Sequence, residues 1–138
     1  MDKKILRIDL LSDWQKHFAF GLGEVVLRER DSHNNIVYEL LLATNAFDLI
    51  MNLSNDYLSQ IPESTIYKYK YSRDFKENAW ASRNEELIAD IEGFYCYLKG
   101  NKSNVDENLF GKEYNEVIKI CKSIIKNETS LYLIADDY

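Results

Sequence analysis

Three acid–base residues near the N-terminus are the first candidates for chemistry. Asp9, Asp13 and His17 follow one another at four-residue intervals, a spacing that would align two carboxylates and an imidazole on a helix as metal ligands or as an acid–base group. Residues 3–11, however, alternate apolar and polar side chains, which is typical of a half-buried strand. A strand would separate Asp9 from the other two residues. We therefore expect a solvated histidine beside scattered carboxylates, and no metal site.

Nucleophilic catalysis would need a base within hydrogen-bond reach of a serine or cysteine. His17 and His33 are the only histidines, and His33 falls in a predicted turn. The chain has no GxSxG, P-loop or HExxH motif. Its 23 acidic residues leave room for a carboxylate pair that meets only in the folded chain, but no spacing singles one out. The sequence predicts no catalytic residue, no cofactor and no enzyme.

Composition indicates one small acidic domain. A chain of 138 residues with 46% hydrophobic residues can bury a continuous core, so a single domain over 1–138 is expected. The net charge of −6 disfavours direct nucleic-acid binding and favours a basic partner. The first residues lack the apolar run of a signal peptide or membrane span, which predicts a cytoplasmic protein without membrane contact. Cys96 and Cys121 are predicted to be reduced packing residues.

The elements that must position any site centre on a long hairpin over 18–44. Two β-rich runs flank the turn-forming segment Asp31–Asn35, and period-2 alternation places Val26 on the same face as Leu40 and Leu42. Further strands are predicted at 3–11, 65–71 and 130–135, and helices at 46–60, 82–99 and 113–127. This order predicts an α+β fold, a mostly antiparallel sheet with a long central hairpin, covered by about three helices.

Tyrosines alternate with lysines in the segment 65–71, TIYKYKY. In a strand, Tyr67, Tyr69 and Tyr71 would share one face and the lysines the other. Such a tyrosine face suits a half-buried sheet and also a partner-binding surface, while the lysines would protect an edge strand from pairing with other chains. Base stacking on nucleic acid is the weaker interpretation because the neighbouring acidic residues oppose it.

The helix predicted over 82–99 begins with a capping box, in which Ser82 and Glu85 satisfy each other's backbone donors. Its apolar stripe faces the core. Two rows of carboxylates flank this stripe without a cation between them, at Glu85, Glu86, Asp90 and Glu92. The helix is therefore predicted to carry an acidic partner face. The C-terminal Asp136 and Asp137 either add to it or form a frayed, solvated end.

In size, acidity and lack of motifs, the chain resembles the small cytosolic immunity proteins of bacterial toxin–immunity pairs, such as those of contact-dependent growth inhibition. The resemblance implies a basic protein partner, a nuclease toxin domain whose substrate groove the inhibitor occupies by charge complementarity. The residues that carry it are the acidic ones named above, with the three tyrosines as anchors. Since these proteins share no common motif, no site residue is transferred.

Three alternatives stay open. Phage-encoded inhibitors of nucleic-acid-processing complexes have the same physical profile. A small enzyme or ligand-binding α+β domain would assemble its site only in three dimensions. A homo-oligomeric structural domain would associate through the edge strand predicted at 65–71.

Overall fold

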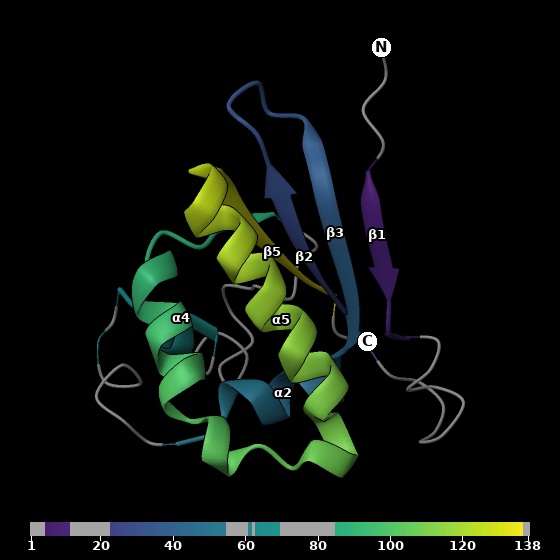
Figure 1. Ribbon diagram of the computed structural model, residues 1–138, viewed down its shortest axis with the longest axis vertical. Coiled ribbons are helices and arrows are strands. Elements are labelled where there is room, and N and C mark those ends of the chain that lie inside the picture. Colours follow the sequence, from purple (N-terminus) through teal and green to yellow (C-terminus); the bar gives the residue numbers. More distant parts are fainter. Residues whose placement is uncertain (1–4, 12–22, 55–60, 62, 70–84, 137–138) are drawn as a thin grey trace.

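A five-stranded mixed sheet forms the centre of the protein, in a computed structural model that describes residues 5–11, 23–54, 61, 63–69 and 85–136 (Figure 1). The strands are β1 (Leu6–Asp9), β2 (Glu24–Arg30), β3 (Ile36–Ala43), β4 (Glu86–Leu87) and β5 (Ser130–Asp136). The helices are α2 (Thr44–Met51), α4 (Ile91–Gly100), α5 (Glu107–Asn127) and the short 3-10 helix η2 (Lys102–Asn104). Residues 65–69 are also helical.

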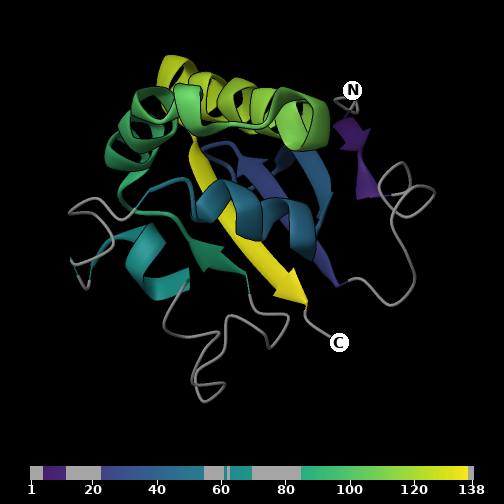
Figure 2. The same ribbon diagram turned by 90° about the horizontal axis from the view of Figure 1, so that it is seen from below.

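The strand order is β1-β3-β2-β5-β4, with β1 parallel to β3 and the other pairs antiparallel. Helices α4 and α5 form a layer over one face of the sheet, while β1 lies at the edge beyond them in both views (Figures 1 and 2). The predicted α+β fold with a mostly antiparallel sheet and a central hairpin is confirmed.

The hairpin turn is held by local hydrogen bonds. The Asp31 carboxylate accepts from the backbone N–H groups of His33 and Asn35, both at 2.9 Å. Asn34 adopts a left-handed conformation with φ of 67°, which asparagine tolerates better than most residues. These turn residues explain why the hairpin could be predicted from the sequence.

A β-bulge decides which hairpin residues face the helices. The pairing shifts by one residue near the turn, where Arg30 opposes Ile36, so that Leu27 rather than Val26 opposes Leu40. A one-residue shift moves a side chain to the other face of a sheet. Leu27 and Leu40 accordingly belong to the core under the helices, and Val26 does not. The face predicted for Val26 is therefore wrong.

Sheet pairing replaces the start of the helix predicted over 82–99. Glu86 and Leu87 form β4 against β5, and the N–H of Ile88 donates to the carbonyl of Leu131 at 2.9 Å. Helix α4 begins only at Ile91. The extra strand supplies hydrogen bonds with a distant segment, and these outweigh the local capping signal. Ser82 itself lies outside the described residues.

The other two helices differ from their predicted bounds. The one predicted over 46–60 is α2, which begins at Thr44, two residues earlier than predicted, and ends at Met51. Helix α5 starts earlier than the predicted 113, because Asp106 caps it by accepting from the N–H groups of Asn108 and Leu109. Of the apolar side chains predicted to face inward, Val117, Cys121 and Ile124 are buried and Ile118 is half-buried, whereas Ile125 is exposed and its predicted orientation is wrong.

Candidate partner-binding surface

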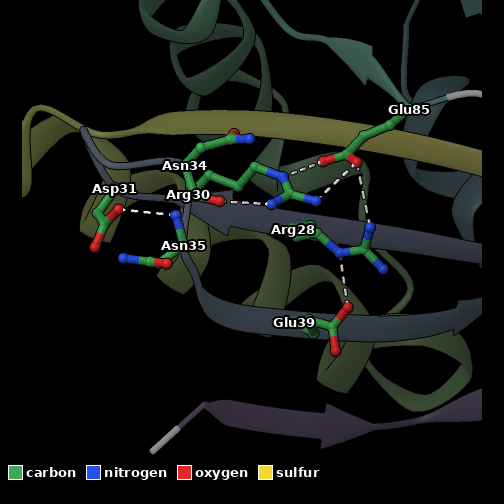
Figure 3. Close-up of polar contacts among 7 residues, drawn as sticks. All are labelled: Arg28, Arg30, Asp31, Asn34, Asn35, Glu39 and Glu85. Atoms are coloured by element: carbon green, nitrogen blue, oxygen red, sulfur yellow. Dashed lines mark hydrogen bonds and ion pairs between the residues drawn. The ribbon is translucent and has the colours of Figure 1, made fainter. Parts of the chain in front are cut away.

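Glu85 joins two arginines on the sheet face opposite the helices (Figure 3). Its carboxylate accepts from Arg30 Nε at 2.7 Å and from Arg30 Nη2 at 3.0 Å, which is a bidentate pair. Arg28 Nη1 donates to the same carboxylate at 3.3 Å. Glu85 thus binds two strand residues that lie 57 and 55 positions earlier in the chain.

Arg28 extends this cluster to the next strand, because its Nε donates to Glu39 at 2.7 Å. The result is a row of alternating charges with side chains between 13% and 24% exposed. We call it the sheet-face ladder, and it consists of Glu39, Arg28, Glu85 and Arg30. Its two carboxylates and two guanidinium groups cancel in charge.

Arg30 is the most connected member of the ladder. Its Nη1 donates to the Asn34 carbonyl at 2.7 Å, and its guanidinium carbon lies 6.0 Å from the ring centroid of Tyr132. The planar guanidinium can satisfy several acceptors at once while resting on an aromatic face. Arg30 therefore ties together the hairpin turn, β5 and the residue before β4.

The hydrogen-bonded pair of Arg30 and Glu85 also shifts the pKa of both residues. Hydrogen bonding from Arg30 lowers the pKa of Glu85, against the opposing effect of partial burial. The same hydrogen bond raises the pKa of Arg30. The Glu85 carboxylate is thus neutralised by cations of its own chain, and the prediction that it belongs to an unneutralised acidic row is wrong.

Asp90 also forms hydrogen bonds within its own chain. One carboxylate oxygen accepts from the Thr65 N–H at 3.1 Å, and the other accepts from the Thr65 hydroxyl. These contacts hold the first residue of the helical stretch 65–69, as a capping side chain does. The Asp90 carbonyl accepts from the N–H of Phe94 at 2.9 Å, so the same residue starts α4. Asp90 therefore positions two helices.

Among the four carboxylates predicted between Glu85 and Glu92, Glu86 and Glu92 have no partner in the described part of the chain. Neither forms an ion pair or hydrogen bond with any residue of the described ranges. Glu86 is half-buried and Glu92 is exposed. Leu87 lies between them in the sequence with 50% of its surface exposed. We call residues 86–92 the β4–α4 segment.

The tyrosines predicted to share a strand face do not do so. Residues 65–69 are helical, with the Ser64 hydroxyl accepting from the N–H of Tyr67 at 3.1 Å as an N-cap. Tyr69 is a core residue, 2% exposed, whose hydroxyl donates to Asp48 at 2.5 Å. Its ring meets that of Phe47 edge to face at 5.1 Å. The N-cap hydrogen bond of Ser64 and the burial of Tyr69 therefore favour a helix over the strand that the alternation of tyrosines and lysines predicted.

Of the remaining predicted anchors, Tyr67 is half-buried in this helical stretch, and Tyr71 lies outside the described residues. Asp136 ends β5 opposite Glu24, and Asp137 also lies outside the described residues. Of the three tyrosines predicted as anchors, Tyr69 is therefore a core residue and does not belong to a partner surface.

A buried polar cluster on the helix side was not predicted. Glu29, 2% exposed, accepts from the hydroxyls of Ser123 and Thr129, each at 2.7 Å. On the neighbouring strand, the Tyr38 hydroxyl donates to Glu116 at 3.4 Å. Burial and this carboxylate raise the pKa of Tyr38 to about 12. The cluster fastens the end of α5 to the sheet, and its only sequence signal was a charged residue in a β-rich run.

The two cysteines are free thiols in different environments. Cys121 is fully buried, and burial raises the pKa of its thiol to about 12. Cys96 is exposed on α4, so the prediction that it is a packing residue is wrong. Asp9 lies on β1, while Asp13 and His17 are outside the described residues. Within the described ranges, no three metal-binding side chains come together.

Comparisons with known proteins add no relative. Searches of protein-family models, curated proteins and solved structures found no match to this chain. None of the described helices has the length and apolar character needed to cross a membrane.

Proposed function

We propose that this protein is an interaction module that binds and neutralises a basic protein, as an immunity protein neutralises a nuclease toxin. The observation that carries the proposal is the β4–α4 segment. Glu86 and Glu92 have no partner among the described residues, and Leu87, between them in the sequence, is exposed on the sheet face opposite to that of Glu86. Carboxylates without a partner in their own chain suit a basic partner surface, and the exposed Leu87 offers an additional apolar contact.

Two other carboxylates, Glu85 and Asp90, hold this segment in place by hydrogen bonds to the rest of the chain. Glu85, directly before it, is bound to Arg28 and Arg30 of β2, and Asp90, within it, is bound to Thr65. Both are positioning residues. A segment anchored near both ends loses little conformational entropy on binding, so more of the contact energy appears as affinity.

The overall charge supports fast association with a basic partner. The chain carries a net charge of −6. The sheet-face ladder contributes nothing to this charge, because its two glutamates and two arginines cancel. The excess negative charge therefore resides elsewhere, including on the two open glutamates. Long-range attraction of this kind raises the association rate and weakens with added salt.

Co-expression with the products of the neighbouring genes tests the proposal. A toxic neighbour whose growth defect is relieved by this protein, and which binds it directly, is the expected result. Neighbouring products that are harmless, or whose toxicity persists without binding, would contradict it.

Charge reversal then tests the segment. Glu92→Lys should lower the association rate by on the order of tenfold and flatten its salt dependence. Glu107→Lys is the matched control, because Glu92 and Glu107 both lie in the first turn of a helix and are both exposed. Equal effects of the two substitutions would remove the β4–α4 segment from the interface.

A further inference from the structure

β1 is an edge strand with apolar side chains in solvent. Among the described strands, only β3 pairs with it. Ile5 and Leu6 are 48% and 51% exposed, and the helix layer does not extend over this edge (Figures 1 and 2). An edge of this kind is a template for pairing with another strand.

The pairing with β3 determines which backbone groups of β1 point outward. The N–H of Leu10 donates to the carbonyl of Leu41 at 2.9 Å, and residues along a parallel strand alternate between facing the partner and facing away. Leu6, Ile8 and Leu10 therefore direct their backbone groups toward β3. Arg7 and Asp9 direct theirs to the side of β1 away from β3, where no described strand pairs with it.

We propose that β1 pairs antiparallel with β1 of a second copy of this chain, about a two-fold axis at Ile8. In this register Arg7 opposes Asp9 of the second copy, and Asp9 opposes its Arg7. Both pairs consist of outward-facing residues, so each exchanges its two backbone hydrogen bonds. Each also sets opposite charges side by side, which favours a cross-strand pair.

The other symmetric registers lose these features. An axis at Arg7 or at Asp9 places like charges opposite each other, and an axis at Leu6 places Arg7 opposite an isoleucine. An axis between two residues would oppose outward-facing groups to inward-facing ones. Charge and hydrogen-bond direction thus select the same register. In it, the alternating side chains of β1 complement those of β1 in the second copy.

Both faces of the joined sheets fit this pairing. On the helix side, Ile8 meets Ile8 of the second copy on the axis. On the opposite side, Arg7 lies beside Glu39, its register partner on β3, and Glu39 is bound to Arg28. Asp9 of the second copy would therefore extend the alternating charges of the sheet-face ladder across the dimer.

The dimer would leave the β4–α4 segment open, because β4 lies at the opposite edge of the sheet. Each copy would present its own segment at one end of a continuous sheet. The inference does not depend on the proposed function, since self-association is measured without any partner.

Sedimentation of the full chain over a concentration series up to about 1 mM tests the proposal, a range chosen because a short edge pairing is weak. The wild type should show a monomer–dimer equilibrium that weakens with salt. Arg7→Asp should weaken the dimer by on the order of tenfold or more, since it opposes two carboxylates at both symmetric pairs. Asp9→Arg should do the same with two guanidinium groups.

Two combinations restore the charge pairing. The double substitution Arg7→Asp with Asp9→Arg should recover dimerisation, and an equimolar mixture of the two single variants should form heterodimers. Asp9 also accepts from the N–H of Leu11 at 3.0 Å. The double variant also loses this hydrogen bond. If the double variant nevertheless dimerises, the weakening seen in the single variants is due to charge. A wild type that stays monomeric, or a dimer indifferent to Arg7→Asp, would overturn the proposal.

Disulfide trapping gives a second readout. Ile8→Cys, in a Cys96→Ser background that removes the exposed native thiol, should form a disulfide-linked dimer under mild oxidation. A residue on the two-fold axis of a non-hydrogen-bonded pair lies close to its mate, within the range that a disulfide spans. Leu6→Cys in the same background is the control, because it opposes Leu10 of the second copy and should not cross-link. Equal cross-linking of both variants would contradict the register.

Discussion

Arg30 and Glu85 form a bidentate ion pair across the sheet, with Nε to Oε1 at 2.7 Å and Nη2 to Oε2 at 3.0 Å, although they lie 55 residues apart in the chain. The pair links the end of the central hairpin to the residue before β4. It therefore anchors the start of the β4–α4 segment to the central hairpin. We propose this segment as the partner surface.

Removing the Glu85 charge should destabilise the protein. Glu85→Gln loses the bidentate pair and leaves Arg30 without its carboxylate, and we expect a loss of about 1–2 kcal/mol in the free energy of unfolding. Glu92→Gln, at an exposed position without a described partner, should change it by less than about 0.5 kcal/mol. Urea unfolding measures both. Equal effects would show that the pair contributes nothing beyond a surface charge.

The contribution of Glu85 should depend on pH in a defined direction. Arg30 lowers the pKa of Glu85 below its ordinary value of 4.5 in the folded chain. The ionised carboxylate therefore adds stability that is complete above that value and is lost as the pH falls through the lower, folded pKa. The difference in unfolding free energy between wild type and Glu85→Gln should be constant near neutral pH and shrink below about pH 4.5. A difference that grows on acidification would contradict this assignment.

Tyr69 and Tyr67 should respond very differently to truncation. Tyr69 fills the core against Phe47 and donates to Asp48, so Tyr69→Ala should cost about 3–5 kcal/mol of unfolding free energy. Tyr69→Phe keeps the ring and should cost about 1 kcal/mol, for the lost hydrogen bond. Tyr67→Ala, at a half-buried position, should cost less than Tyr69→Ala. Similar losses at both positions would contradict the helical placement of residues 65–69.

The buried Glu29 should be energetically coupled to Ser123. The Ser123 hydroxyl donates to this carboxylate at 2.7 Å, so Ser123→Ala leaves a buried acceptor with one donor fewer and should cost about 1–3 kcal/mol. In a Glu29→Gln background the same substitution should cost less, because the acceptor is no longer charged. A double-mutant cycle measures the coupling. Additive costs would show that the hydroxyl does not stabilise the charge.

The sequence determined the features that depend on neighbouring residues. The hairpin follows from the turn residues Asp31 and Asn34, whose hydrogen bonds and backbone conformation are local. The second half of α5 follows from an apolar stripe at helical spacing, and this stripe is sufficient to predict that Cys121 is buried. Fold class follows from the order of such elements.

Tertiary structure alone decided which charges remain open. Four carboxylates between Glu85 and Glu92 look equivalent in sequence, but Glu85 meets arginines 55 and 57 positions away and Asp90 meets a threonine 25 positions away. Pairings at such separations depend on strand order and on a one-residue bulge, neither of which local propensity encodes. For that reason only Glu86 and Glu92 lack an ion pair or hydrogen bond among the described residues, as the sequence predicted for all four.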